Sequence, residues 1–342
     1  MTQVVEAHQL TRKDFISSQE VRWCPGCGDY AILATVQRIL PDLGIPRERF
    51  VWVSGIGCSS RFPYYLDTYG FHTIHGRAPA IATGIRAANP DLSVWIATGD
   101  GDGLSIGGNH LLHVLRRNLE VRILLFNNRI YGLTKGQYSP TSERGKVTKS
   151  SPFGTVDYPV EPASFAMGCG ATFVARAIDV SANPLGAVLR RAATHHGAAF
   201  VEIMQNCVVF NDGAFDSFAS KADAPDQQLH VEHARPLIYG RDRNKGLVFD
   251  PRSLMLRTVE IGVDGVTEAD ILVHDETNPF IGSLLARLPH PEFPVVLGVL
   301  HAASRPTYED GLAAQHFRAE GNEAGPKTVQ ELLSSGRTWR VQ

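Results

Sequence analysis

The stretch SVWIATGDGDGLSIGGNHLLHVLRRNLEVRILLFNN, residues 93–128, decides the fold of this 342-residue chain. It begins with a short apolar run to Thr98, passes through a glycine-rich turn at 99–103 and a helical segment near 106–118, and ends in a second apolar run before Asn127-Asn128. Short, continuous apolar runs are typical of strands that are covered on both faces. The stretch therefore predicts a strand–helix–strand unit, whose right-handed crossover makes the two strands parallel.

Apolar runs alternate with helical segments on both sides of this unit, from about residue 31 to residue 206. Three more short runs predict strands at 50–53, 172–176 and 199–203. This rhythm is typical of an α/β fold in which helices cover both faces of a parallel sheet. We therefore expect an α/β domain over residues 1–220.

The rest of the chain is less regular. Residues 221–342 contain a basic run at 241–245 and an apolar segment at 295–300, and they predict an irregular C-terminal lobe over the sheet. Another irregular stretch, 131–162, is rich in Gly, Ser, Thr, Pro and Lys. Because long loops in compact domains often carry function, we expect this loop to form part of a site.

The composition limits the classes of partner. The chain is 43% hydrophobic and 20% charged, and its formal net charge is only -2. That balance leaves no electrostatic footprint for nucleic acid or an anionic membrane. No apolar run approaches the roughly 20 residues of a membrane helix, and the polar start Met1-Thr2-Gln3 lacks the pattern of a signal peptide. We expect a cytoplasmic protein that binds neither nucleic acid nor membranes.

Asp100 and Asn128 each follow one strand of the quoted stretch. Since the carboxyl ends of parallel strands meet at one edge of a sheet, the two side chains can converge there. Carboxylate and amide oxygens suit Mg²⁺, which usually shares its coordination with phosphates. Glycines in the turn and the start of the next helix favour close approach of a phosphate. The sequence predicts a site for magnesium and a small phosphorylated ligand.

The five cysteines are too few and too clustered for a disulfide scaffold. Cys24 and Cys27 form a close pair, while Cys58 and Cys207 each follow a predicted strand and belong to the same carboxyl edge. Cys169 precedes a strand, so we expect it at the opposite edge as a core thiol. Four thiolates fit a 4Fe-4S cluster, with structural zinc as the alternative.

Gly99-Asp100-Gly101, followed by Asn127-Asn128, resembles the thiamine diphosphate motif. By that resemblance Asp100 and Asn128 ligate Mg²⁺ through their side chains and Ile130 through its carbonyl. Asp102 either orients a ligand or caps the next helix. A thiamine cofactor beside four thiolates favours the cluster over zinc, because zinc has no redox role.

Five motifs in order resemble the β subunits of the 2-oxoacid:ferredoxin oxidoreductases. They are RWCPGCG (22–28), GIGCS (55–59), HGRA (75–78), GDGDG with Ile106-Gly107 (99–107) and YGLTKGQ (131–137). The resemblance covers about residues 23–212, and the tail after His233 carries weaker motifs. It implies the diphosphate-binding half of the thiamine diphosphate fold. It also implies oxidative decarboxylation of a 2-oxoacid, in which electrons pass through a 4Fe-4S cluster to ferredoxin. The acyl group passes to coenzyme A.

The resemblance also implies an obligate α subunit that carries the pyrimidine-binding domain, in an αβ heterodimer or an (αβ)2 assembly. The cofactor would be held by residues of these motifs: Gly57, Cys58, Ser59, His75, Gly99, Asp100, Gly101, Asp102, Asn128, Ile130, Gly132, Leu133 and Thr134.

We expect the choice of substrate to depend on Lys135. The pyruvate enzymes of the family that this chain resembles share a glycine at this position. The Lys135 ammonium could pair with the distal carboxylate of 2-oxoglutarate; the alternative is a solvated loop lysine. His75 and Arg77 are further candidates for contact with cofactor or substrate, although a structural hydrogen bond would also explain His75. His110 is expected to be structural. Pyruvate and branched-chain 2-oxoacids remain alternative substrates.

Two other functions remain open from the residues alone. One is a cluster-free thiamine lyase or synthase, in which the cysteines are incidental. The other is a nonenzymatic module that zinc stabilises at the cysteines.

Overall fold

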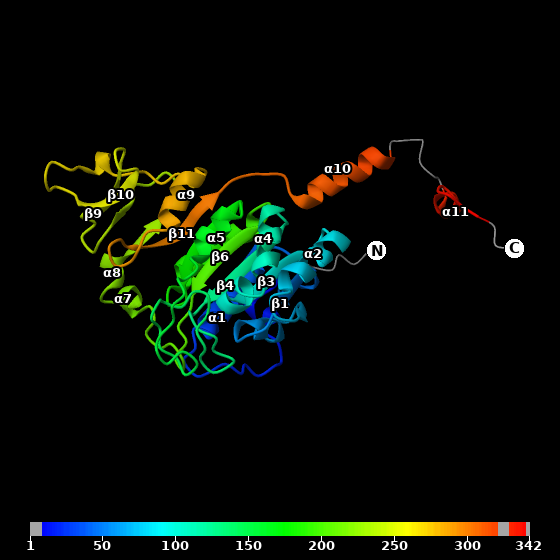
Figure 1. The fold of residues 1–342 in the computed structure, drawn as a ribbon, viewed down its shortest axis with the longest axis horizontal. Coiled ribbons are helices and arrows are strands. Elements are labelled where there is room, and N and C mark those ends of the chain that lie inside the picture. The colour runs from blue at the N-terminus through cyan, green and yellow to red at the C-terminus, as the bar shows by residue number, and fades with distance from the viewer. Residues whose placement is uncertain (1–8, 321–327, 340–342) are drawn as a thin grey trace, which may run out of the picture.

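The structure, a computed structural model, describes residues 9–320 and 328–339. In these residues the main feature is an eight-stranded sheet (Figure 1). Its strands, in spatial order, are β2 (Tyr69–His72), β1 (Phe50–Ser54), β3 (Ser93–Gly99), β4 (Val121–Asn127), β6 (Ala199–Met204), β5 (Phe173–Ile178), β11 (Val295–Ala302) and β7 (Gln228–Val231).

The six strands from β2 to β5 are mutually parallel. Strands β1, β3, β4, β5 and β6 confirm the five predicted from apolar runs. β3 and β4 run in register from Val94 opposite Val121 to Gly99 opposite Phe126. The residues after both strands therefore leave the sheet at one edge.

Helices cover both faces of this sheet. α2 (Ala78–Ala88), α4 (Gly108–Arg116), α5 (Pro162–Gly168) and α9 (Pro279–Ala286) pack into one apolar core, and α1 (Asp29–Ile39) and α6 (Ala182–Thr194) into the other. The second core contains the stacked Trp52 and Trp95, whose ring centroids are 5.1 Å apart. Two cores with a sheet between them are the layered arrangement that the alternating sequence predicts.

The C-terminal third is more regular than expected. The apolar segment 295–300 belongs not to an irregular lobe but to β11, which runs antiparallel to β5 inside the main sheet. β7 then pairs in parallel with β11. Whether residues 1–220 and 221–342 form separate domains stays a prediction.

The remaining elements lie around this sheet. A small antiparallel sheet contains β8 (Ile238–Tyr239), β9 (Lys245–Asp250) and β10 (Met255–Glu260), and the basic run 241–245 lies largely in the turn between β8 and β9. The other helices are α3 (Asp100–Leu104), α7 (Asp216–Ala219), α8 (Ala224–Gln227), α10 (Tyr308–Glu320) and α11 (Val329–Leu333), and α10 extends away from the sheet (Figure 1).

The loop after β4 contains no helix or named strand from residue 128 to residue 161, as the composition predicts. Figure 1 shows it beneath β4 and β6. No helix in the described part of the chain is long and apolar enough to cross a membrane. The loop and the carboxyl edge of the sheet together position the candidate site.

Candidate functional site

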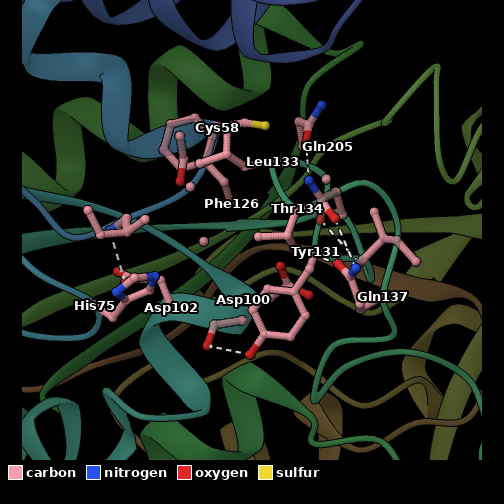
Figure 2. Close-up of a pocket in the computed structure, with 18 of the residues that line it drawn as sticks. Cys58, His75, Asp100, Asp102, Phe126, Tyr131, Leu133, Thr134, Gln137 and Gln205 are labelled. Atoms are coloured by element: carbon pink, nitrogen blue, oxygen red, sulfur yellow. Dashed lines mark hydrogen bonds between the residues drawn. The ribbon is translucent and has the colours of Figure 1, made fainter. Parts of the chain in front are cut away.

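A cavity of about 440 Å³ opens at the carboxyl edge of β1, β3 and β4 (Figure 2). Its walls come from segments far apart in the sequence, which meet because the parallel strands end together. Among the predicted cofactor residues, those that line it are Gly57, Cys58, Ser59, His75, Gly99, Asp100, Gly101, Asp102, Asn128, Ile130, Gly132, Leu133 and Thr134. The structure thus brings together the whole set of predicted cofactor residues.

Asp100 begins α3 at the floor of this cavity and is 3% exposed. Its Oδ2 accepts hydrogen bonds from the hydroxyls of Ser139 and Thr141, each at 2.5 Å. Burial raises the pKa of Asp100, and the two hydroxyl donors oppose that rise. A buried carboxylate held in one orientation is suited to a divalent cation, which would supply the opposite charge.

Asn128 is oriented by one backbone group and one side chain. Its Oδ1 accepts a hydrogen bond from the Ile130 amide at 3.2 Å, and its Nδ2 donates to Gln205 Oε1 at 3.0 Å. An amide oxygen can accept one hydrogen bond and still offer a second lone pair to a metal. Asn128 therefore keeps a ligand atom available in the cavity that Asp100 also lines.

Asp102 is hydrogen-bonded to three segments of the chain. Its Oδ1 accepts from the amides of Ile56 and Gly76, at 3.0 and 2.7 Å, and its Oδ2 accepts from Thr98 Oγ1 at 2.7 Å. Three bonds to three different segments occupy both of its oxygens. Asp102 therefore fastens the loops after β1 and before α2 to the end of β3.

Gly101 is required by a ring packed against it. A Cβ at this position would lie 2.2 Å from the Tyr131 ring, whose hydroxyl donates to the Gly101 carbonyl at 3.2 Å. This contact joins the turn after β3 to the loop after β4, and Figure 2 shows Tyr131 beside Asp100. The glycine at the centre of the motif thus serves packing between two walls of the cavity.

Two buried polar groups in the cavity lack ordinary partners in the described chain. Ser59 Oγ has none, and the carboxylate of Asp29 has no partner other than the neighbouring Cys27 thiol. Burial raises the pKa of Asp29 to about 7. Because buried polar atoms are normally satisfied, their presence here indicates that the cavity is built for a polar ligand. The donor set and the cavity fit a diphosphate cofactor with its cation.

His75 and Arg77 separate in the structure. His75 lines the cavity, whereas Arg77 at the start of α2 contacts His110 Nε2 on α4 and is not part of the lining. Burial, followed by the charge of Arg77, lowers the pKa of His110. His110 is thus a partner of Arg77, in line with the structural role predicted for it.

A smaller cavity of about 200 Å³ lies beside the first. Cys24, Cys27, Cys58 and Cys207 all line it, together with Lys135. A Cβ at Gly132 would lie 3.5 Å from the Cys58 sulfur and 3.6 Å from the Cys207 sulfur, so Gly132 packs directly beside both thiols. We call this space the cysteine cavity.

Burial raises the pKa of Cys58 to about 12 and that of Cys27 still further, and the charge of Asp29 is the next contribution to both. Thiols in this state must lose their protons to bind a metal. Among the described residues, no group of three or more His, Cys, Asp or Glu side chains is arranged to hold a metal ion. The number and chemistry of the thiols, and their enclosure in one cavity, nevertheless fit an iron–sulfur cluster.

Cys169 lies outside the cysteine cavity. It follows α5 and packs against the core on the α2–α4 side of the sheet. Cys207, by contrast, lies three residues beyond β6. The edges that the sequence predicts for these two cysteines are therefore the ones observed.

Lys135 lies in a tight turn. The Tyr131 amide donates to the Gln137 carbonyl at 2.8 Å, and Gly136 and Lys135 close the turn by donating to Tyr131 and Gly132. Lys135 has φ of 78°, a left-handed conformation that favours glycine. A glycine at this position would therefore suit the turn for backbone reasons alone.

The sequence reasoning missed several residues of the site. Ser139 and Thr141 hold Asp100, and Gln205 lines both cavities, as do Cys58 and Asn128. Hydroxyls in a long irregular loop carry no spacing signal. Asp29 could have been found, because it directly follows the motif of Cys24 and Cys27.

The chain is similar to proteins with thiamine cofactors. Residues 52–203 match the family model described as the thiamine pyrophosphate enzyme, C-terminal TPP binding domain. The matched segment runs from β1 to β6 and so contains the carboxyl edge that forms the larger cavity.

Two curated relatives extend this similarity. The "2-oxoglutarate oxidoreductase subunit KorB" of Mycobacterium tuberculosis is 54% identical over 333 residues, which cover 96% of this chain and 88% of the relative. The "2-oxoacid:ferredoxin oxidoreductase 1, subunit beta" of Aeropyrum pernix is 48% identical over 190 residues, which cover 56% of this chain and 60% of the relative.

One solved structure is similar to this chain over nearly its whole length. It is a 2-oxoglutarate:ferredoxin oxidoreductase from Magnetococcus marinus, with 2-oxoglutarate, coenzyme A and succinyl-CoA bound. The TM-score is 0.77 at 33% sequence identity, and the alignment covers 98% of each chain.

Proposed function

Because this chain belongs to the family of 2-oxoacid:ferredoxin oxidoreductase β subunits, we propose that it acts with an α subunit on 2-oxoglutarate and coenzyme A. The products are succinyl-CoA, CO2 and a proton, and the two electrons released pass through a 4Fe-4S cluster to ferredoxin. The enzyme acts in the cytoplasm, as an αβ heterodimer or (αβ)2.

One observation carries this proposal: the two cavities share their walls. Cys58, Asn128, Gly132, Leu133 and Gln205 line both the larger cavity and the cysteine cavity. A cofactor in the first would thus be separated from a cluster in the second by single side chains. This arrangement suits direct electron transfer and has no use in a lyase.

Asp100 and Asn128, with the Ile130 carbonyl, would hold Mg²⁺, and the glycine-rich turn would accept the diphosphate. Thiamine diphosphate supplies the carbanion chemistry that releases CO2 from a 2-oxoacid. The chain's own contribution is orientation: Ser139 and Thr141 fix Asp100, and Asp102 fixes the loops around the turn.

Cys24, Cys27, Cys58 and Cys207 would ligate the cluster. Four thiolates would bind structural zinc equally well. Zinc has no redox role, however, so it would not explain why the thiols lie beside the cofactor cavity. Iron is therefore the better assignment.

The need for an α subunit agrees with the lining of the larger cavity. Among its described residues the carboxylates are Asp29, Asp100 and Asp102, with no glutamate, whereas thiamine enzymes generally need one on the pyrimidine ring. A second protein would supply it, along with the rest of the pyrimidine site.

Lys135 is proposed to recognise the distal carboxylate of 2-oxoglutarate. It lines the cysteine cavity, and Leu133, which lines both cavities, lies two residues before it. A substrate with its oxoacid head in the larger cavity could extend past Leu133 toward the ammonium. His75 is placed to contact the head of the substrate or the cofactor, while Arg77 would act through His110.

The test is to copurify the chain with its α partner and to measure anaerobic viologen reduction, dependent on coenzyme A, with 2-oxoglutarate, pyruvate and branched-chain 2-oxoacids. We expect a brown protein that prefers 2-oxoglutarate. A preference for pyruvate or a branched-chain acid would overturn the substrate, and a colourless protein that decarboxylates without reducing viologen would indicate a lyase.

A further inference from the structure

Gln205 connects the two cavities through its side chain. It follows β6 directly, is 1% exposed, and lines both the larger cavity and the cysteine cavity. Its Oε1 accepts from Asn128 Nδ2 at 3.0 Å, and its Nε2 donates to Cys27 Sγ at 3.3 Å and to the Asn206 carbonyl at 2.5 Å. One buried amide thus bonds a candidate magnesium ligand at one end and a candidate cluster ligand at the other.

The orientation of this amide is fixed at both ends. The Ile130 amide can only donate, so Asn128 must direct Oδ1 toward it and Nδ2 toward Gln205. The Asn206 carbonyl can only accept, so it requires the Gln205 nitrogen on its own side. Both constraints direct the Gln205 N–H to the Cys27 sulfur and leave no alternative assignment.

The backbone holds Gln205 in this position. Its amide donates to the Asn127 carbonyl at 2.9 Å, which continues the pairing of β6 with β4 by one residue. A Cβ at Gly28 would lie 1.8 Å from Asp179 Oδ2 and 3.0 Å from Gln205 Cγ, so the glycine after Cys27 leaves space for both side chains. The bridge is therefore part of the packing between the cysteine motif and the sheet.

We propose that Gln205 is a positioning residue that tunes the cluster through an N–H···S hydrogen bond to Cys27 and steadies the magnesium ligand Asn128. This proposal rests on the proposed function, since it assumes a cluster at Cys27 and Mg²⁺ at Asn128.

A hydrogen-bond donor to a cluster thiolate stabilises the reduced cluster, which carries the additional negative charge. Loss of the donor therefore lowers the reduction potential. Loss of the acceptor for Asn128 leaves that amide held only by the Ile130 N–H, which weakens the binding of thiamine diphosphate and Mg²⁺.

Two substitutions separate these effects. Gln205→Leu removes both bonds without adding charge, whereas Gln205→Glu keeps an acceptor for Asn128, removes the N–H donor and adds a negative charge beside Cys27. Gln228→Leu is the matched control. Gln228, the first residue of β7, is also buried, and its Nε2 donates a hydrogen bond to the Phe218 carbonyl at 2.7 Å.

The experiment is a redox titration of the copurified αβ enzyme, followed by electron paramagnetic resonance, together with thiamine diphosphate binding in the presence of Mg²⁺. We expect a lower cluster potential in both Gln205 variants. Cofactor affinity should fall about threefold to tenfold in Gln205→Leu alone, the loss typical of one buried hydrogen bond. The Gln228 variant should match the wild type in both measurements.

Wild-type potentials in both Gln205 variants would overturn the proposal, because a merely structural residue changes the amount of cluster and not its potential. Loss of the cluster from both variants, with the control intact, would also overturn it and make Gln205 a folding determinant. If instead the wild-type enzyme contained no iron or did not reduce viologen, the proposed function itself would have failed.

Discussion

At the scale of single residues, the site depends on polar groups that the fold buries and holds in place. Asp100 is enclosed by two hydroxyls, Asp102 by three donors, and Asn128 by one donor and one acceptor. Polar groups fixed in this way cannot turn to suit a ligand, so they must already have the geometry that the ligand requires. Substitution of Asp100 or Asn128 should therefore weaken binding, whereas substitution of Asp102 should also loosen the segments that it holds together.

Asp100→Asn and Asp100→Ala should abolish retention of thiamine diphosphate and Mg²⁺, since the cation loses its charged ligand. The expected loss in cofactor affinity is at least about 100-fold. Changing a residue that only supports a metal ligand already costs up to about that factor in metal affinity, and Asp100 would be a ligand itself. Cofactor content after gel filtration measures this loss, and Asp91→Ala, an exposed aspartate before β3, is the control. Full occupancy in the Asp100 variants would refute the assignment.

Lys135→Ala should lower kcat/KM for 2-oxoglutarate by roughly one to two orders of magnitude, while turnover of pyruvate stays level or rises. The estimate is the worth of one charge-assisted hydrogen bond, about 1.5 to 3 kcal/mol. Lys135→Arg keeps the charge and should retain much of the preference. Lys135→Gly controls for the left-handed backbone and should behave like the alanine variant. Equal losses for both substrates would make Lys135 a cofactor or folding residue.

Single residues also show what a sequence can and cannot predict. Asp100, Asn128 and the cysteines carry a fixed spacing from strands, so their meeting place follows from topology. Ser139, Thr141 and Gln205 act through contacts that only the folded loop creates, and no periodicity marks them. The position of Lys135 beside the cysteines likewise depends on a turn whose shape the sequence did not specify.

At the scale of elements, the parallel strands decide which side chains can meet. Cys207 follows β6, and Cys169 lies ahead of β5 at the other edge of the sheet. Cys207→Ser should therefore impair the cluster and sharply reduce iron and sulfide content, whereas Cys169→Ser should leave both nearly unchanged. Chemical analysis of the anaerobic protein decides between them. The reverse result would show that the cluster uses a different set of thiols.

His195, which caps α6 away from the site, makes stability depend on pH. Thr172 Oγ1 donates to Asn118, so His195 Nε2 must donate to Thr172, at 2.8 Å. Burial, and then the charge of Arg122, lowers the pKa of His195 to about 4, below the value near 6.5 of an unfolded chain. The folded state thus resists protonation. Its stability is complete above about pH 6.5 and falls as the pH decreases toward 4.

His195→Gln keeps a donor to Thr172 but does not titrate. The fall in Tm between about pH 7 and pH 4.5 should therefore be smaller in the variant than in the wild type. Identical pH profiles would show that protonation of His195 is not coupled to unfolding.

The sequence predicted five of the strands correctly because each is a continuous apolar run. It did not predict that β11 enters the main sheet beside β5, nor that β7 forms its edge. The pairing of β5 with β11 joins segments more than a hundred residues apart, and no local pattern encodes such a partner. The direction of β11, opposite to that of β5, depends on the same non-local contact.

At the scale of the whole molecule, the fold provides half of an active site. The six parallel strands bring the glycine-rich turn, the long loop and the cysteine motif to one edge, and two adjoining cavities form there. The glutamate and the pyrimidine pocket that thiamine chemistry needs would come from the α subunit. The chain alone should therefore be inactive, even with both cofactors supplied.

In the proposed function, electrons from 2-oxoglutarate enter a cluster held by this chain. The most direct measurement is electron paramagnetic resonance of the anaerobic αβ enzyme, frozen after 2-oxoglutarate and coenzyme A are added. We expect the signal of a reduced 4Fe-4S cluster, which requires 2-oxoglutarate and is absent from the Asp100→Asn enzyme. Formation of succinyl-CoA with no change in the cluster, or a protein that contains zinc in place of iron, would contradict the proposed function.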